Sequence, residues 1–244
     1  ALEQASLRLS QRDDPRWTLL QGSFDQLRQR LTEVGVQGCD GVLADLGLST
    51  LQLDDPDRGF SFRFQGPLDM RMDRRSPGTA LDVIRGSSTR EFARILREYG
   101  EERHAERIAR MVREGVRRGS IRDTHELAHA VREASRQKRA GGVDAATRTF
   151  MALRIAVNQE LAQLSRLLDS ILDVLAPGGV FVCLSYHSLE DRIVKHALRK
   201  LAREGAGRVL TTKPLTASRD EVRQNRRARS AKLRAFRREG EQER

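Results

Sequence analysis

The sequence predicts an α/β fold: a mostly parallel sheet with an inserted group of helices. Two observations carry this prediction. Short apolar runs at 42–46 and 180–184 have the composition of strands buried on both faces of a parallel sheet, and helical segments separate them. From Thr79 to about Ala140 the pattern is helical with no strand signal, which indicates a separate helical subdomain.

The N-terminal part alternates helices with strands, as a parallel α/β sheet does. Because Ala1 is not a methionine and lies inside a predicted helix, we expect the chain to lack the beginning of its domain. The elements that we expect are a helix over 1–14, a strand over Trp17–Leu20, a helix over Phe24–Leu31 capped by Ser23 and closed by Gly35, and a strand over 41–46.

A long loop follows this last strand. Asp45 stands where the strand ends, and open α/β sheets bind ligands at the carboxyl ends of their strands. The next twenty or so residues are turn formers and mixed charges, a length that is usual for functional or disordered loops. Phe60, Phe62 and Phe64 alternate within it and argue against disorder. We therefore interpret it as a binding loop.

The rest of the chain returns to the sheet. A long helix over about 146–176 has one continuous apolar stripe, and Pro177-Gly178-Gly179 ends it before the second apolar strand. Ser188 to Asp191 has capping-box spacing and opens a helix through Leu201, and 208–212 is a further strand candidate. The predicted organisation is a sheet domain in two parts (1–78 and 141–218), a helical insertion (79–140) and a basic tail (219–244).

Composition points to a polyanionic partner. The net charge of +11 favours nucleic acid over a membrane, although a merely Arg-rich surface is the alternative. No apolar run approaches the roughly 18 residues that span a bilayer. Cys39 and Cys183 lie in strand contexts, which favours small buried residues in a reducing cytoplasm over a disulfide. No His, Cys and Asp cluster has metal-ligand spacing, so we expect no metal.

Five stretches resemble the ribosomal RNA small subunit methyltransferase H family. They read DLGLSTLQLDDPDRGFSFRFQGPLDMRMD, EYGEERHAERIAR, ATRTFMALRIAVNQEL, LSYHSLEDRIVK and NRRARSAKLR. The resemblance implies a class I methyltransferase sheet with a helical insertion. It also implies S-adenosylmethionine-dependent methylation of the exocyclic N4 amine of a decoding-site cytosine in 16S RNA of the small ribosomal subunit.

The resemblance also suggests site residues. It implies that Phe24, Asp45 and Gln52 bind the cofactor, an aromatic ring by stacking on adenine and the others by hydrogen bonds. The family's glycine-rich first loop and the acid after the next strand are not in this sequence, so we expect this chain alone to bind S-adenosylmethionine weakly and to be inactive. Asp144-Ala145 replaces the family's His-Pro, and Tyr186 replaces its Phe.

Several residues have both a functional and a structural interpretation. Asp45 and His187 are the catalytic candidates; alternatively, Asp45 caps backbone amides and His187 makes structural hydrogen bonds. The run from Asp69 to Asp73 either contacts substrate or is a solvated edge. The tail arginines are candidate phosphate ligands, against a solvated tail as the alternative. These arginines are Arg226, Arg227 and Arg229, with Arg234, Arg237 and Arg238.

Two other functions stay open at this stage. A non-catalytic RNA-binding protein could have kept the methyltransferase scaffold, as the missing cofactor loop and the basic tail suggest. The same fold could also methylate another RNA or a protein amine. An RNA methyltransferase remains the main prediction because the family stretches and the acid at the strand end agree.

Overall fold

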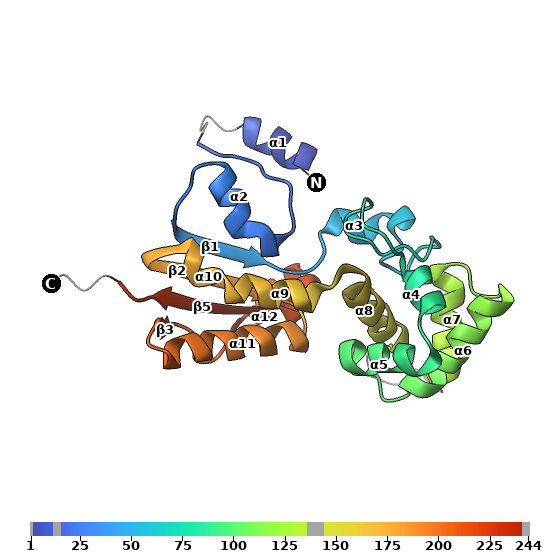
Figure 1. Ribbon diagram of the computed structural model, residues 1–244. Helices are drawn as coiled ribbons and strands as arrows, with labels where there is room; N and C mark the ends of the chain where they lie inside the picture. The colour runs from blue at the N-terminus through green and yellow to red at the C-terminus, as the bar shows by residue number, and fades with distance from the viewer. Residues whose placement is uncertain (1, 12–15, 136–143, 241–244) are drawn as a thin grey trace. The chain divides into compact units, whose positions relative to one another are not determined.

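The computed structural model describes residues 2–11, 16–135 and 144–240, and it has the predicted mixture of sheet and helices (Figure 1). By its contacts the chain divides into two compact units, a first made of residues 1–47 and 161–244 and a second made of residues 48–160. The helical insertion expected at 79–140 lies inside the second unit.

The first unit contains the sheet. Its elements are α1 (Leu2–Ser10), η1 (Phe24–Gln26), α2 (Leu27–Glu33), β1 (Cys39–Asp45), α9 (Glu160–Asp169), α10 (Ile171–Val174), β2 (Leu175–Ser185), α11 (Ser188–Arg203), β3 (Gly207–Val209), β4 (Leu215–Thr216), α12 (Arg219–Gln224), η3 (Arg226–Ser230) and β5 (Lys232–Arg238). The strand order is β1-β2-β5-β3, with β4 also paired to β5. Among the described strands, only β1 and β2 run parallel, and β5 is antiparallel to its neighbours. The prediction of a mostly parallel sheet is therefore confirmed for the β1–β2 pair and is wrong for the pairings of β5.

The strand predicted at Trp17–Leu20 is wrong. These residues form no ladder with any described strand, and both end residues remain exposed, at 37% for Trp17 and 40% for Leu20. The helix predicted after them does form, as η1 followed by α2. Gly35 follows its end in the left-handed region, at φ 76°, as predicted for a helix stop.

The sheet is buried more completely on one face than on the other. Phe181 and Cys183 of β2 are buried, as is Phe236 of β5, and they share one core with apolar residues of α9 and α11. On the other face Leu43 of β1 is 67% exposed among the described residues. The prediction of a strand buried on both faces is therefore wrong for β1, because the described helices supply a core to one side only.

The prediction of one continuous helix over 146–176 is wrong, although the segment is largely helical. The structure divides it into α8 (Ala145–Asn158), α9 and α10, with Gln159 in the left-handed region at φ 51° between the first two. Phe150 and Leu153 belong to the core of the second unit, whereas Leu164 and Leu168 belong to the core of the first. One apolar stripe in the sequence thus serves two cores.

The second unit is helical, as predicted. Its elements are α3 (Thr50–Asp54), η2 (Pro56–Arg58), α4 (Ala80–Gly86), α5 (Thr89–Gly100), α6 (Ala105–Arg118), α7 (Thr124–Ser135) and α8. Helix α7 begins with Asp123 Oδ1 accepting from the Glu126 amide, whereas Thr124 donates its hydroxyl to the Phe64 carbonyl. Thr124 therefore ties the preceding loop to the helix.

The long loop after β1 packs into the core of this unit. Phe60, Leu68 and Met70 are buried there. The Phe62 and Phe150 rings pack edge to face, with their centroids 5.1 Å apart. Two turns of the loop approach so closely that a Cβ at Gly59 would lie 1.9 Å from the Pro67 carbonyl oxygen. The loop is thus ordered, as its aromatic residues predicted.

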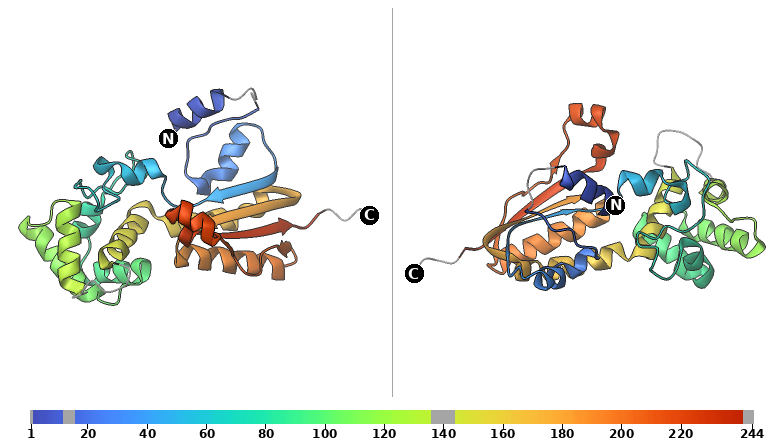
Figure 2. Two further views of the ribbon diagram at one scale, coloured as in Figure 1. Left: turned by 180° about the vertical axis from the view of Figure 1, so that it is seen from behind. Right: turned by 90° about the horizontal axis from the view of Figure 1, so that it is seen from above.

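The C-terminal segment is not a solvated tail. Strand β5 lies between β2 and β3, and Arg234 within it is 5% exposed and paired with Asp191. Arg238 donates to the backbone carbonyls of Leu172 and Leu175. Arg234 is therefore a buried structural residue, and the prediction that it binds phosphate is wrong. We call the part before β5, Arg219–Ser230, the basic arm; Figure 2 shows its helix α12 standing away from the sheet.

No helix within residues 2–11, 16–135 and 144–240 is long and apolar enough to cross a membrane.

Candidate active site at the carboxyl ends of β1 and β2

The last residues of the two parallel strands bring a carboxylate and a phenol together. Asp45 ends β1 in register with Leu184, and Tyr186 follows the end of β2. The Tyr186 hydroxyl donates to Asp45 Oδ1 at 2.9 Å. Asp45 is exposed, and its second oxygen, Oδ2, accepts no hydrogen bond from a described residue. The sheet therefore presents one free carboxylate oxygen where ligands bind in open α/β folds.

Tyr186 is the residue that the sequence interpretation passed over. Burial, then the hydrogen bond and charge of Asp45, raise the pKa of Tyr186 to about 12. The phenol therefore stays protonated, and able to donate, throughout the neutral range. A signal was available in the sequence: a hydroxyl one residue past an apolar strand lies at the same sheet edge as an acid that ends a parallel neighbour.

His187 caps the helix that follows β2. Its Nδ1 accepts from the Glu190 amide at 3.4 Å, and the Glu190 carboxylate accepts from the His187 amide at the same distance. The cap thus stands one residue before Ser188, where the capping box was predicted. Nε2 is buried 3.1 Å from Glu190 Oε1, without the geometry of a hydrogen bond. These contacts favour the structural interpretation of His187.

Phe24, a predicted cofactor residue, lies in the first unit with Asp45. It begins η1, and its ring is 38% exposed. The prediction that Ser23 caps this helix is wrong for its side chain. The Ser23 hydroxyl instead donates to Gln163 Oε1 at 2.9 Å. An exposed aromatic ring fits the adenine of S-adenosylmethionine, on which it can stack.

Gln52, the other predicted cofactor residue, lies in the second unit on α3. Its side-chain oxygen accepts from the Ser49 amide at 3.2 Å and from the Ser49 hydroxyl at 3.1 Å, which closes a capping box. The oxygen is therefore engaged in starting the helix. The amide nitrogen Nε2 is the group of Gln52 that can donate to a ligand.

The charges of the segment after the binding loop neutralise one another. Arg71 donates two side-chain hydrogen bonds to the Asp69 carboxylate, at 2.8 and 2.9 Å, and Arg75 pairs with Asp73 in the same way. The hydrogen bonds from Arg75 lower the pKa of Asp73 to about 2. Both carboxylates are thus paired within their own segment, which supports a structural part in ordering it.

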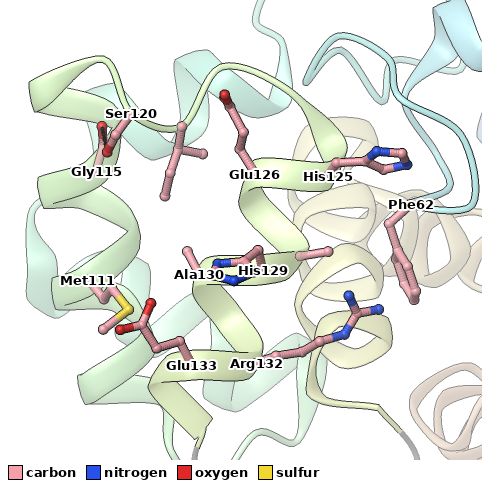
Figure 3. Close-up of a pocket in the computed structure, with 12 residues that line it drawn as sticks. Phe62, Met111, Gly115, Ser120, His125, Glu126, His129, Ala130, Arg132 and Glu133 are labelled. Atoms are coloured by element: carbon pink, nitrogen blue, oxygen red, sulfur yellow. Dashed lines mark hydrogen bonds between the residues drawn. The ribbon is translucent and has the colours of Figure 1, made fainter.

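A hollow of about 770 Å³ opens on the second unit beside α6 and α7 (Figure 3). Its charged side chains are largely engaged with neighbours. Arg132 pairs with Asp144 and lies 5.1 Å from the centre of the Phe62 ring, and Glu126 pairs with Arg122. Within the described ranges, no group of three His, Cys, Asp or Glu residues could hold a metal ion.

Comparison with known proteins identifies the family. The profile of the MraW methylase family matches residues 1–239. The ribosomal RNA small subunit methyltransferase H of Sorangium cellulosum is 51% identical over 240 residues, which cover 98% of this chain and 75% of that protein. The proteins of the same name from Koribacter versatilis and Pelobacter propionicus are each 46% identical, and the matches cover 96% of this chain and 76% and 80% of theirs. The chain therefore belongs to the MraW methylase family, and its α/β sheet with a helical unit is that of a class I methyltransferase.

Proposed function

We propose that the protein transfers a methyl group from S-adenosylmethionine to the exocyclic N4 amine of a decoding-site cytosine in small-subunit ribosomal RNA. The observation that carries the proposal is the Asp45 carboxylate, which ends the parallel pair β1–β2 with one oxygen on Tyr186 and the other free. The names of the relatives, all ribosomal RNA small subunit methyltransferases, support the substrate class.

The cofactor, when bound, supplies a methyl group on a sulfonium sulfur, ready for displacement by an amine. In the first unit, the exposed Phe24 would offer its ring as a stacking surface for adenine. Within the second unit, Gln52 keeps the hydrogens of its amide nitrogen for a ligand. Asp45 has one free oxygen, and the proposal keeps that oxygen for the substrate amine.

Asp45 also has a part in the chemistry. The lone pair of a cytosine amine is delocalised into the ring and is a poor nucleophile. A carboxylate oxygen that accepts one of the amino hydrogens draws electron density back to the nitrogen and fixes its direction. Orientation of this kind contributes roughly 7–11 kcal/mol in well-aligned reactions. We assign His187 to the helix cap because its ring nitrogens both face Glu190.

The RNA would be held by the basic arm. Arg226, Arg227 and Arg229 are exposed on η3, and Arg226 and Arg229 form no ion pair with a described residue. Guanidinium groups suit phosphate oxygens, which position an RNA without reading its bases. The proposed partner is the small ribosomal subunit, which places the protein in the cytoplasm.

The test replaces Asp45 in the protein. Asp45→Asn keeps the shape of the side chain but removes its charge, so we expect methyl transfer to small ribosomal subunits to fall by about a hundredfold or more. Asp40→Asn is the matched control, because Asp40 is exposed on the same strand, β1, and should leave transfer unchanged. Mass spectrometry of nuclease-digested RNA would identify the methylated nucleoside.

Three results would contradict the proposal. Near-normal transfer by Asp45→Asn would remove Asp45 from the site. A methylated nucleoside other than N4-methylcytidine would replace the proposed target, even if Asp45 proved essential. RNA binding without any methyl transfer by the wild-type protein would favour the non-catalytic alternative.

A further inference from the structure

We infer that Tyr186 is a positioning residue of this protein, which holds the Asp45 carboxylate in a fixed orientation for methyl transfer through a hydrogen bond that the family's usual Phe cannot make. This inference rests on the proposed function, since it concerns the same carboxylate. The hydroxyl of Tyr186 occupies Oδ1 at 2.9 Å and leaves Oδ2 to meet the amine. A positioning residue must itself be held in place, and both the backbone and the ring of Tyr186 are.

The backbone of Tyr186 is fixed by a buried acid. Its amide donates to Glu190 Oε2 at 2.9 Å, and Glu190 is 2% exposed. The same carboxylate accepts from the His187 amide as part of the helix cap. Charged acceptors make hydrogen bonds about twice as strong as neutral ones. The start of α11 thus sets the point from which the phenol side chain extends.

The ring of Tyr186 lies against the chain that leaves β1. A Cβ built on Gly47 would lie 3.4 Å from Tyr186 Cδ2, so the ring is in contact with the backbone two residues after Asp45. Gly47 has φ 92°, a conformation that favours glycine. This turn and the ring therefore fit together, with the hydroxyl directed at the carboxylate.

The bond matters because Asp45 is exposed. A carboxylate at a solvated strand end rotates freely unless a donor holds it, and water competes for both oxygens. A phenol supplies one donor from one direction, so it fixes the plane of the carboxylate and occupies one oxygen only. A lysine in its place would donate in several directions and add a positive charge beside a cationic cofactor. The chemistry of tyrosine suits the task.

The kinetic test uses Tyr186→Phe, which keeps the ring and its contact with Gly47 and removes only the hydroxyl. We expect kcat for methyl transfer to fall about tenfold, as for loss of a hydrogen bond to a charged group, with KM for the ribosomal subunit unchanged. Tyr99→Phe is the matched control, because Tyr99 is the only other tyrosine of the chain and lies on α5 in the second unit. It should leave kcat unchanged.

A spectroscopic test detects the bond without activity. With tyrosine labelled at Cζ by ¹³C, the chain gives two signals, one from each tyrosine, and Tyr186→Phe assigns them. Asp45→Asn should shift the Tyr186 signal and leave that of Tyr99 in place. In the double variant, Tyr186→Phe should cost nothing beyond Asp45→Asn alone, because the phenol acts only through the carboxylate.

The outcomes separate the inference from the function. If Asp45→Asn abolishes transfer while Tyr186→Phe keeps the full kcat, the inference is overturned and the proposed function stands. A Tyr186 signal that does not respond to Asp45→Asn also overturns it. If Asp45→Asn is fully active, the proposed function itself fails.

Discussion

At the scale of single residues, the two cysteines differ in their chemistry. Cys183 on β2 is 1% exposed, and burial, together with the nearby Glu190, Asp45 and Asp191 carboxylates, raises the pKa of its thiol to about 12. The thiolate is the reactive form of cysteine. Cys183 is therefore a small apolar core residue, whereas Cys39 at the start of β1 is partly exposed.

This difference predicts the outcome of thiol titration. With a disulfide reagent at pH 8, we expect Cys39 to react in the native protein and Cys183 to react only in denaturant, because a raised pKa keeps the buried thiol protonated at that pH. The Cys39→Ser protein is the control and should be unreactive until unfolded. Fast labelling of Cys183 in the native Cys39→Ser protein would contradict the burial.

Sequence reasoning at this scale found Asp45 but misplaced several caps. A polar residue before a helix marks the helix start to within a residue or so, and the hydrogen-bond geometry chooses among neighbours. His187 therefore caps where Ser188 was predicted, and Ser23 contacts Gln163 instead of making its predicted cap. Tyr186 was not foreseen because its partner comes from a strand far away in sequence.

At the scale of elements, the end of α8 holds the buried part of the loop in the second unit. Asn158 donates from Nδ2 to the Met70 carbonyl at 2.8 Å and accepts at Oδ1 from the Met72 amide at 2.6 Å. Met70 is fully buried, and its backbone φ is 60°, a positive value that is uncommon for residues other than glycine. Asn158 thus helps to stabilise a strained turn, together with Arg58, which donates to the Arg71 and Met72 carbonyls.

Replacing this side chain should loosen the turn. We expect Asn158→Ala to destabilise the second unit by about 2 kcal/mol, since it leaves a partly buried donor and acceptor without partners. Hydrogen exchange of peptides that contain the Met72 amide should accelerate. Thr147→Ala is the matched control, because Thr147 is exposed on the same helix. Unchanged exchange at Met72 would show that the turn holds without Asn158.

The apolar stripe over 146–176 shows why the ends of α8, α9 and α10 could not be predicted from the sequence. Hydrophobic spacing reports that a face is buried but not against which core it is buried. The stripe continues in phase across Gln159, although its first half packs in the second unit and its second half in the first. Asn158 is the last residue of α8, and its side chain contacts Met72 in a loop far away in the sequence. The hydrophobic spacing of the helix does not report that contact.

At the scale of the molecule, an ion pair between α11 and β5 ties the first unit together. Burial alone would raise the pKa of Asp191, but hydrogen bonds from Arg234 and Lys232 hold it below its usual value. A lowered pKa in the folded state contributes stability that is present above the unfolded pKa, near 3.9, and is lost as the pH falls through the folded value.

The expected result is a change in acid sensitivity. Asp191→Asn should lower the free energy of unfolding of the first unit at pH 7 by about 3 kcal/mol, as for a buried pair that loses one partner. The variant should then lose less stability than wild type as the pH falls below 4. Asp173→Asn, which breaks an exposed pair with Arg28, should cost about 0.5 kcal/mol or less. Parallel acid curves for wild type and Asp191→Asn would contradict this linkage.

The net charge of +11 belongs to the whole molecule, and the basic arm is where we expect it to meet RNA. Replacing Arg226, Arg227 and Arg229 with Ala should weaken binding of target and non-target RNA alike, because phosphate contacts carry no base information. The logarithm of the RNA-binding constant falls linearly with the logarithm of the salt concentration, and each lost phosphate contact should reduce the magnitude of this slope by about 0.7 to 0.9. The triple variant should therefore reduce it by about two units.

The matched control keeps the charge. The triple replacement with Lys should retain most of the slope, because the counterions released depend on charge. Binding is measured at several salt concentrations for the three proteins. A slope that does not change in the Ala variant would mean that the arm does not touch phosphate.

The order of the strands has a consequence for how the chain is made. Of the described strands, β1 is synthesised before the whole second unit, and β2 and β5 are synthesised after it. The second unit is one continuous segment and can fold as soon as it emerges, whereas the edge of β1 that pairs with β2 must wait for that distant partner. During that interval this edge is open, the kind of strand edge that aggregates or recruits chaperones. Slower translation of residues 161–185 would therefore lengthen the time for which this edge of β1 is unpaired.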